Sequence, residues 1–190
     1  MLICACINIW VIITELAIPH MGITDLRYLC DEMLKKLSRW LRIAGYDVIS
    51  PSNITDKSMA RLSKEQNRIL LTRDRDLANM KDVDSLLIRN KDLESQLEEI
   101  FNEFPPDVFP PGKTRCPLCN SNLELISRSE IDQAVVGVEI PEGVYERKDL
   151  FFRCSRCGKY YWIGKHWDRI GSVLGRYSID PLSELKITGT

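Results

Sequence analysis

The fold is decided by the stretch Arg68-Ile69-Leu70-Leu71-Thr72-Arg73-Asp74-Arg75-Asp76. Its first five residues form a largely apolar run, which is typical of a strand in a sheet buried on both faces. Its last four residues alternate basic and acidic side chains, and they lead into a short helix that we predict to end at Met80. A buried strand that passes directly into charged residues and a helix indicates an α/β fold.

The same alternation extends in both directions along the chain. Further apolar runs predict strands over 26–30, 46–49 and 85–88. Helices are predicted over 32–44, from Thr55 or Asp56 onward, and over 92–104, because apolar residues recur there at three- and four-residue steps. This order predicts a parallel sheet wrapped by helices over residues 25–104. Four prolines within residues 105–112 then predict a stiff linker.

Two cysteine pairs follow the linker, Cys116-Pro-Leu-Cys119 and Cys154-Ser-Arg-Cys157. The two-residue spacing lets both sulfurs of a pair bind one metal, and two pairs supply the four ligands of a structural Zn²⁺ site. We therefore predict a small β-rich zinc ribbon over residues 113–170, followed by a tail over 171–190. Two separate dithiols or disulfides are the alternative, which a reducing, cytoplasmic setting disfavours. A closed zinc site does no chemistry, so any activity must come from other residues.

Aspartates follow the predicted strands at the points where these strands end. Asp31 follows the first strand, Asp74 and Asp76 follow the third, and Asp56 begins the helix that leads into the third. In an open parallel sheet, ligands bind at the carboxyl ends of the strands, so three or four of these side chains are expected to converge there. Clustered carboxylates are the ligands that Mg²⁺ and Mn²⁺ prefer, and such a site hydrolyses phosphodiesters. Helix capping and ion pairing are the alternatives for Asp56, Asp74 and Asp76.

Basic side chains accompany these acids. Arg39 and Arg42 lie with Lys35 and Lys36 on the polar side of the predicted helix 32–44, and Arg73 and Arg75 alternate with the acids. A solvated helix face is one interpretation of the first group. The other is that Arg39, Arg42, Arg73 and Arg75 position substrate phosphates.

Neither the net charge nor the N-terminus identifies a partner. The formal net charge is −1, which permits a polyanionic partner without demanding one. Residues 1–24 are largely apolar. They fit a start-site artefact with Met21 as the true start, an extra packed element, or a signal-like or membrane-associated segment. Against a signal peptide, this stretch has no basic n-region. Against a membrane span, Asn8, Thr14 and Glu15 interrupt the apolar run.

Several of these motifs, in this order, resemble the PIN-like RNase domain first named from the C-terminus of the mutator-seven exonuclease, which carries a C-terminal zinc ribbon. They are Leu29-Cys30-Asp31-Glu32-Met33-Leu34, Leu37-Ser38-Arg39-Trp40-Leu41-Arg42, Gly45-Tyr46-Asp47, Ile69 to Asp76, the four cysteines, and Tyr161-Trp162-Ile163-Gly164-Lys165-His166-Trp167. The resemblance covers about residues 26–169.

The resemblance implies a three-layer PIN-like α/β fold and an endoribonuclease that uses Mg²⁺ or Mn²⁺. It places Asp31, Asp56 and Asp74 at acidic ligand positions, with Asp76 as the fourth. Many PIN nucleases have Glu where Asp56 stands, which alters the reach to a metal. RNA is the implied partner, and DNA is not predicted.

Other functional interpretations of the same residues remain open. A non-catalytic RNA- or ribosome-binding module is the main alternative, and a phosphoacceptor receiver domain or a toxin fits the pattern less well. Tyr160, Tyr161, Trp162 and Trp167 are expected either to stack on unpaired bases or to form the small core of the ribbon. His166, between the tryptophans, is expected to pack structurally or to contact RNA. The oligomeric state is left open.

Overall fold

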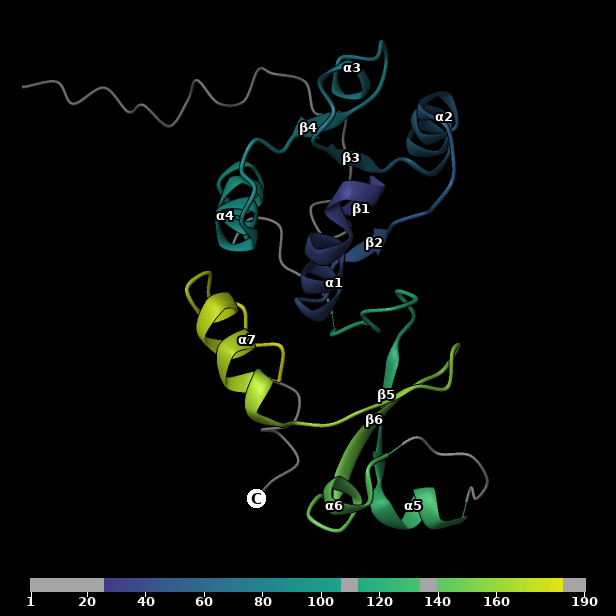
Figure 1. The fold of residues 1–190 in the computed structure, drawn as a ribbon, viewed down its shortest axis with the longest axis vertical. Coiled ribbons are helices and arrows are strands. Elements are labelled where there is room, and N and C mark those ends of the chain that lie inside the picture. The colour runs from purple at the N-terminus through teal and green to yellow at the C-terminus, as the bar shows by residue number, and fades with distance from the viewer. Residues whose placement is uncertain (1–25, 107–112, 134–139, 183–190) are drawn as a thin grey trace, which may run out of the picture.

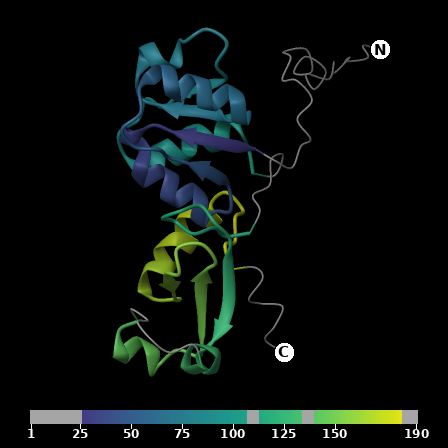
Figure 2. The same ribbon diagram turned by 90° about the vertical axis from the view of Figure 1, so that its right-hand side faces the viewer.

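The computed structural model describes residues 26–106, 113–133 and 140–182 (Figures 1 and 2). The predicted N-terminal segment and most of the Pro-rich linker lie outside these ranges. The described chain forms an upper unit built on a parallel sheet and a lower unit built on an antiparallel sheet (Figure 1). No helix within the described ranges is both long and apolar enough to cross a membrane.

The parallel sheet has four strands in the order β2-β1-β3-β4. These are β1 (Arg27–Cys30), β2 (Asp47–Ile49), β3 (Ile69–Thr72) and β4 (Ser85–Leu87). The central strands β1 and β3 are buried almost throughout, as their continuous apolar sequence predicts. Because β2 and β3 lie on opposite sides of β1, the chain reverses direction across the sheet, and β1 and β3 flank the point of reversal.

Helices cover both faces of this sheet, which makes a three-layer α/β unit (Figure 2). One face packs against α1 (Lys35–Ile43) and α4 (Leu93–Glu103), and the other packs against α2 (Asp56–Gln66) and α3 (Arg75–Ala78). Consecutive residues of β1 alternate between the faces, since Tyr28 and Cys30 join the first core cluster and Leu29 joins the second. The predicted helix 32–44 begins as a 3₁₀ turn, η3 (Glu32–Leu34).

The lower unit is an antiparallel sheet of β5 (Leu123–Ser127), β6 (Leu150–Cys154) and β7 (Tyr160–Tyr161). Two short helices, α5 (Arg128–Gln133) and α6 (Glu142–Tyr145), lie at its far end (Figure 1). The antiparallel strands and the four cysteines are compatible with a zinc ribbon.

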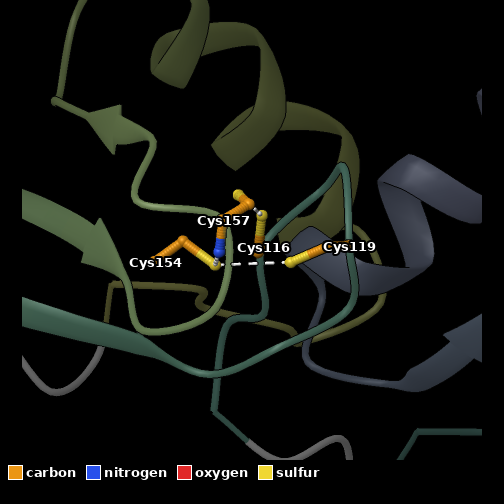
Figure 3. Close-up of side chains that lie close together, drawn as sticks. All are labelled: Cys116, Cys119, Cys154 and Cys157. Atoms are coloured by element: carbon orange, nitrogen blue, oxygen red, sulfur yellow. Dashed lines mark hydrogen bonds between the residues drawn. The ribbon is translucent and has the colours of Figure 1, made fainter.

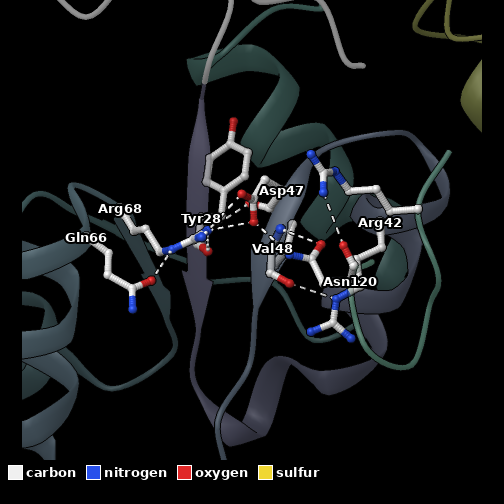
Figure 4. A network of polar contacts seen from close by, with 8 residues as sticks. Tyr28, Arg42, Asp47, Val48, Gln66, Arg68 and Asn120 are labelled. Atoms are coloured by element: carbon white, nitrogen blue, oxygen red, sulfur yellow. Dashed lines mark hydrogen bonds and ion pairs between the residues drawn. The ribbon is translucent and has the colours of Figure 1, made fainter. Parts of the chain in front are cut away.

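Arg42 and Asn120 dock the cysteine-bearing unit onto the edge strand β2 (Figure 4). The Arg42 guanidinium donates from Nε to the Val48 carbonyl (2.7 Å) and from Nη1 to the carbonyls of Pro117 (2.8 Å) and Leu118 (3.1 Å). Oδ1 of Asn120 accepts from the Val48 N–H (3.0 Å). The exposed hydrogen-bonding edge of β2 is thus capped by side chains instead of a further strand.

A partly buried ion pair supports the same junction. Arg68 forms a bidentate pair with Asp47, at 2.8 and 3.2 Å, and Asn120 Nδ2 donates to the same carboxylate (2.7 Å). Burial opposes ionisation of Asp47, but these hydrogen bonds hold its pKa below the usual range. The three residues therefore join β2, the start of β3 and the first cysteine pair.

The last helix, α7 (Lys165–Gly175), returns the chain to the upper unit. Val173, Leu174 and Ile179 are buried in the same core cluster as Tyr28 and Leu37. The boundary predicted between ribbon and tail, at residues 170 and 171, falls inside this helix. A helical face of Ile170, Val173 and Leu174 drives this packing, because these residues recur at three- and four-residue steps.

Arg42 does not lie on a solvated helix face, which was one interpretation of the sequence pattern. Its side chain is only 6% exposed, because the first cysteine pair covers this part of α1. We therefore expect Arg42→Lys to lower the free energy of unfolding by about 1–3 kcal/mol, since a lysine ammonium cannot reproduce the guanidinium geometry at three carbonyls. Urea denaturation measures this change.

The matched control is Arg39→Lys, which changes an exposed arginine of the same helix and should shift stability by less than about 0.5 kcal/mol. Equal stability of the two variants would contradict the docking role of Arg42.

Candidate functional site

The first candidate site is the carboxyl edge of the parallel sheet between β1 and β3. Asp31 follows β1 directly, and Thr72, Arg73 and Asp74 end β3 or follow it. The two strands are neighbours with parallel pairing, so these residues meet at the same edge. This edge lies at the reversal point of the strand order, which is the usual position of ligand sites in open α/β sheets.

Asp31 is held by the protein on both of its carboxylate oxygens. Oδ1 accepts from the backbone N–H groups of Met33 (2.8 Å) and Leu34 (3.2 Å), so the side chain caps η3. Oδ2 accepts from the Thr72 hydroxyl and from the Arg73 N–H (3.1 Å). The residue is 7% exposed, and its carboxylate ties the start of η3 to the end of β3.

The other three predicted aspartates are exposed. Asp74 caps α3, with Oδ1 accepting from the N–H groups of Asp76 (2.7 Å) and Leu77 (3.2 Å). Its own N–H donates to the Thr72 hydroxyl (3.0 Å), so Thr72 links Asp74 to Asp31. Asp76 lies in the first turn of α3. Asp56 is the first residue of α2 and directly follows the capping residue Thr55.

These carboxylates fit a divalent cation in chemistry but not in spacing. Aspartate oxygens are ligands that Mg²⁺ and Mn²⁺ prefer. Among the described residues, however, the four cysteines are the only group of three or more potential ligands whose atoms lie within 4.8 Å of one another. Asp31, Asp56, Asp74 and Asp76 therefore do not form a preassembled three-carboxylate site in this structure.

A cleft of about 670 Å³ lies next to the acidic edge. Met33 from η3, Lys36 from α1 and Arg73 from the end of β3 line one part of it, and Lys91 and the start of α4 line another. Arg169 of α7 and Arg176, which directly follows α7, complete the wall, and both form ion pairs with Glu94. Five basic and three acidic side chains line the cleft, so it favours an anionic ligand.

Of the predicted phosphate-binding arginines, Arg73 is the one that lines this cleft. Its Nε is buried and has no hydrogen-bond acceptor in the described part of the chain. Arg39 and Arg75 are exposed. Arg42 is engaged in the docking of the lower unit, as shown above.

The second candidate site is the cluster of Cys116, Cys119, Cys154 and Cys157 (Figure 3). Their four sulfurs lie within 4.8 Å of one another, and those of Cys119 and Cys154 are 3.3 Å apart. The sulfurs of Cys116 and Cys157 are 3.8 Å apart. Tetrahedral zinc with bonds of about 2.3 Å requires sulfur separations of about 3.8 Å, so this donor set fits Zn²⁺.

The two cysteine pairs have the same backbone geometry. The N–H of Asn120 donates to the Cys116 carbonyl (2.9 Å), and the N–H of Gly158 donates to the Cys154 carbonyl (3.1 Å). Both residues have positive φ, 67° for Asn120 and 71° for Gly158. This conformation favours glycine or asparagine, which are the residues found there.

Tyr161 contacts the cluster from β7. Its hydroxyl lies 3.2 Å from the Cys116 sulfur. Burial opposes ionisation of Cys116, but hydrogen bonds from Tyr161 and from the backbone of Cys119 and Leu118 lower its pKa to about 7. A thiol that ionises near neutral pH is suited to metal binding, because the thiolate is the ligand.

Together these features define an α/β protein with an acidic strand edge, a basic cleft beside it, and a four-cysteine centre that could bind zinc. A family model described as the Mut7-C RNAse domain matches residues 26–174. The match covers most of the chain, and the protein belongs to this family of RNase domains. Comparisons with curated proteins and with solved structures found no match.

The structure also identifies supporting residues that the sequence analysis missed. Thr72 bridges Asp31 and Asp74, Asn120 docks the cysteine unit on β2, and Tyr161 contacts Cys116. Only Asn120 had a sequence signal, since it follows Cys119 at the position that Gly158 occupies after Cys157.

The different settings of Asp31 and Asp74 predict different effects on stability. Asp31→Asn places an amide donor against donors already present, so it should lower the free energy of unfolding by about 1–3 kcal/mol. Asp74→Asn should change it by less than about 0.5 kcal/mol, because asparagine caps helices as well as aspartate does. Urea denaturation of the two variants tests this difference, and equal losses would contradict the hydrogen bonding described for Asp31.

The cysteine cluster predicts about one zinc per chain, measured by elemental mass spectrometry of the purified protein. Cys116→Ser should lose the metal and lower the melting temperature, since structural zinc contributes directly to folding. Cys30→Ala removes a buried cysteine outside the cluster and is the control. Retention of zinc by Cys116→Ser, or its loss from Cys30→Ala, would contradict the assignment.

Proposed function

We propose that this protein is a metal-dependent endoribonuclease that hydrolyses RNA phosphodiester bonds at the acidic edge between β1 and β3. Its membership of a family of RNase domains supports hydrolysis of RNA. The observation that carries the location is the arrangement of Asp31, Thr72 and Asp74, which places two carboxylates on adjacent strand ends at the reversal point of the sheet.

In this proposal the residues have distinct tasks. Asp31 and Asp74 form the centre of the site, and the exposed Asp56 and Asp76 complete it. Arg73, in the basic cleft, positions the substrate phosphate, with Arg39 and Arg75 as outer contacts. Arg42 is proposed to act through the fold, because its guanidinium is occupied by backbone carbonyls. The unit formed by residues 25–104 is then a PIN-like nuclease, and residues 113–170 form a ribbon that helps to hold RNA.

The finer part of the proposal is a Mg²⁺ or Mn²⁺ cofactor at the carboxylates and Zn²⁺ at the cysteines. A divalent cation bound at the acidic edge would activate water and neutralise charge on the phosphate. Reduced thiols at the zinc centre fit a reducing compartment such as the cytoplasm.

A second candidate function is RNA binding without cleavage. It is favoured by the full occupation of the Asp31 carboxylate by four protein donors and by the absence, among the described residues, of a three-carboxylate group within ligand distance. The two functions differ in whether a divalent cation produces cleaved RNA.

The test is cleavage of a panel of single-stranded and hairpin RNAs with added Mn²⁺, Mg²⁺ or neither, by wild type and Asp74→Asn. We expect metal-dependent cleavage by the wild type and a loss of at least about 100-fold in the variant, because it removes a carboxylate charge without a large effect on folding. Gel analysis of end-labelled products measures the rates.

The matched control is Asp82→Asn. This exposed aspartate has φ of 59°, a conformation that asparagine also adopts, and it lies in the loop after α3. It should cleave at the wild-type rate. Equal cleavage by wild type and Asp74→Asn would reject the proposed site, and RNA binding without any cleavage would establish the second function.

A further inference from the structure

Two cavities of the lower unit share a wall made by Trp162 and His166. One is a cavity of about 210 Å³ between β7, the first cysteine pair and α7, and the other is a groove of about 670 Å³ between α6 and the start of α7. Both cavities are lined by these two residues. A methyl group at Gly164 would lie 3.6 Å from the Trp162 indole and 4.0 Å from Nε2 of His166, so the two rings flank the chain at this point.

The smaller cavity is aromatic and apolar. Tyr160, Tyr161, Trp162 and Trp167 supply its aromatic walls, and Ile43 and Ile170 are among its aliphatic lining residues. The Trp167 indole is fixed by its hydrogen bond to the Trp162 carbonyl (2.8 Å), and Tyr161 is fixed at the cysteine cluster. The cavity therefore has rigid walls and presents aromatic faces to a ligand.

Three of these aromatic rings do not belong to the hydrophobic cores of the protein. Tyr160, Trp162 and Trp167 belong to neither of the hydrophobic clusters found among the described residues, and all three are only partly buried. The alternative expected from the sequence, that they form the core of the ribbon, leaves this cavity unexplained. Buried aromatic rings would be expected to fill such a space instead of lining it.

The larger groove is basic. Arg147 and Lys148 follow α6, and Lys165 begins α7, whereas Asp168 is the only acidic residue in its lining. An aromatic pocket that opens beside a basic groove is the arrangement that binds single-stranded nucleic acid, in which a base stacks on the rings and the phosphates lie along the cations. A purely apolar partner would not match the charge of the groove.

We propose that the two cavities form one binding site for single-stranded RNA, with an unpaired base in the aromatic cavity and the adjacent phosphates in the basic groove. This inference rests on the proposed function, since it identifies the class of RNA that the protein holds. The charge of the groove and the size of the aromatic cavity together select an unpaired nucleotide over duplex RNA, whose bases are not accessible for stacking.

Helix α7 connects this site to the acidic edge. His166, Trp167 and Ile170 line the aromatic cavity. Arg169 of the same helix and Arg176, directly after its last residue, line the basic cleft that contains Arg73. An eleven-residue helix is about 16 Å long, so one RNA strand can reach both sites along α7. The ribbon thereby holds RNA at a fixed position relative to the proposed cleavage site.

The experiment measures binding separately from cleavage. The probe is a fluorescein-labelled ten-nucleotide uridine RNA, and its dissociation constant is measured by fluorescence anisotropy with zinc-loaded Asp74→Asn protein in the absence of added Mg²⁺ or Mn²⁺. Adding Trp162→Ala should weaken binding by about 5- to 150-fold, the effect of losing one stacked base. Trp162→Phe should retain most of the affinity. Lys81→Ala, an exposed lysine in the loop after α3 at the opposite end of the molecule, is the control and should have no effect (Figure 1).

Two further measurements separate base stacking from a structural role of Trp162. An RNA of the same length with abasic sites should bind the parent Asp74→Asn protein more weakly than intact RNA does. Adding Trp162→Ala should not weaken the binding of this abasic RNA further. Lys165→Ala should reduce the slope of log Kd against log salt concentration by about 0.7, the effect of one lost phosphate contact on a single strand.

Each result decides between distinct conclusions. Undiminished RNA affinity after Trp162→Ala, or equal affinity of the parent Asp74→Asn protein for intact and abasic RNA, would overturn the base pocket. The second result remains decisive even if Trp162→Ala fails to fold. Binding that depends on Trp162 in a protein that never cleaves RNA would support this site and reject the proposed nuclease, so the two failures are distinguishable.

Discussion

The docking of the first cysteine pair onto strand β2 is the contact on which the arrangement of the whole protein depends. Arg42 and Asn120 satisfy both backbone groups of Val48 and hold the turn at Pro117 and Leu118. Because Asn120 is also the positive-φ residue of that turn, the geometry of the cysteine cluster and its position on the sheet are set by the same residue. The lower unit is consequently oriented by the upper one, and α7 can return to the core with Val173 and Leu174.

At the carboxyl edge of the same sheet, Asp31 holds the acidic edge together. Its carboxylate joins the start of η3 to Thr72 and Arg73, and Thr72 in turn accepts from the N–H of Asp74. For Asp31, a structural role and a role in acting on a substrate are difficult to distinguish, because a substitution affects both. The exposed Asp74 separates the two roles better, since the hydrogen bonds that its side chain makes to described residues go to the first turn of a short helix.

Most of the upper unit could be predicted from the sequence, because its strands are continuous apolar runs and its helices have one apolar face. The alternation of these elements also predicted the parallel sheet, and the cysteine spacing predicted the cluster. Arg42 could not be placed, since the helical pattern marks one buried face of α1 and gives no sign that the cysteine unit covers another. The course of α7 could not be predicted either, because this helix begins in the lower unit and its last residues pack in the core of the upper unit. The gathering of four carboxylates at one metal stays a prediction, because the sequence indicates which strand ends and helix start carry them but not the distances between their side chains.

One RNA strand is proposed to run from the aromatic cavity to the basic cleft beside the acidic edge. Photo-crosslinking of a 4-thiouridine-substituted single-stranded RNA to zinc-loaded Asp74→Asn protein, with the crosslinked peptides mapped by mass spectrometry, tests it most directly. We expect crosslinks on the peptide that carries Trp162 and on the peptide that carries Arg73. Crosslinks confined to the outer face of α2, or found in the ribbon with none at the cleft, would contradict it.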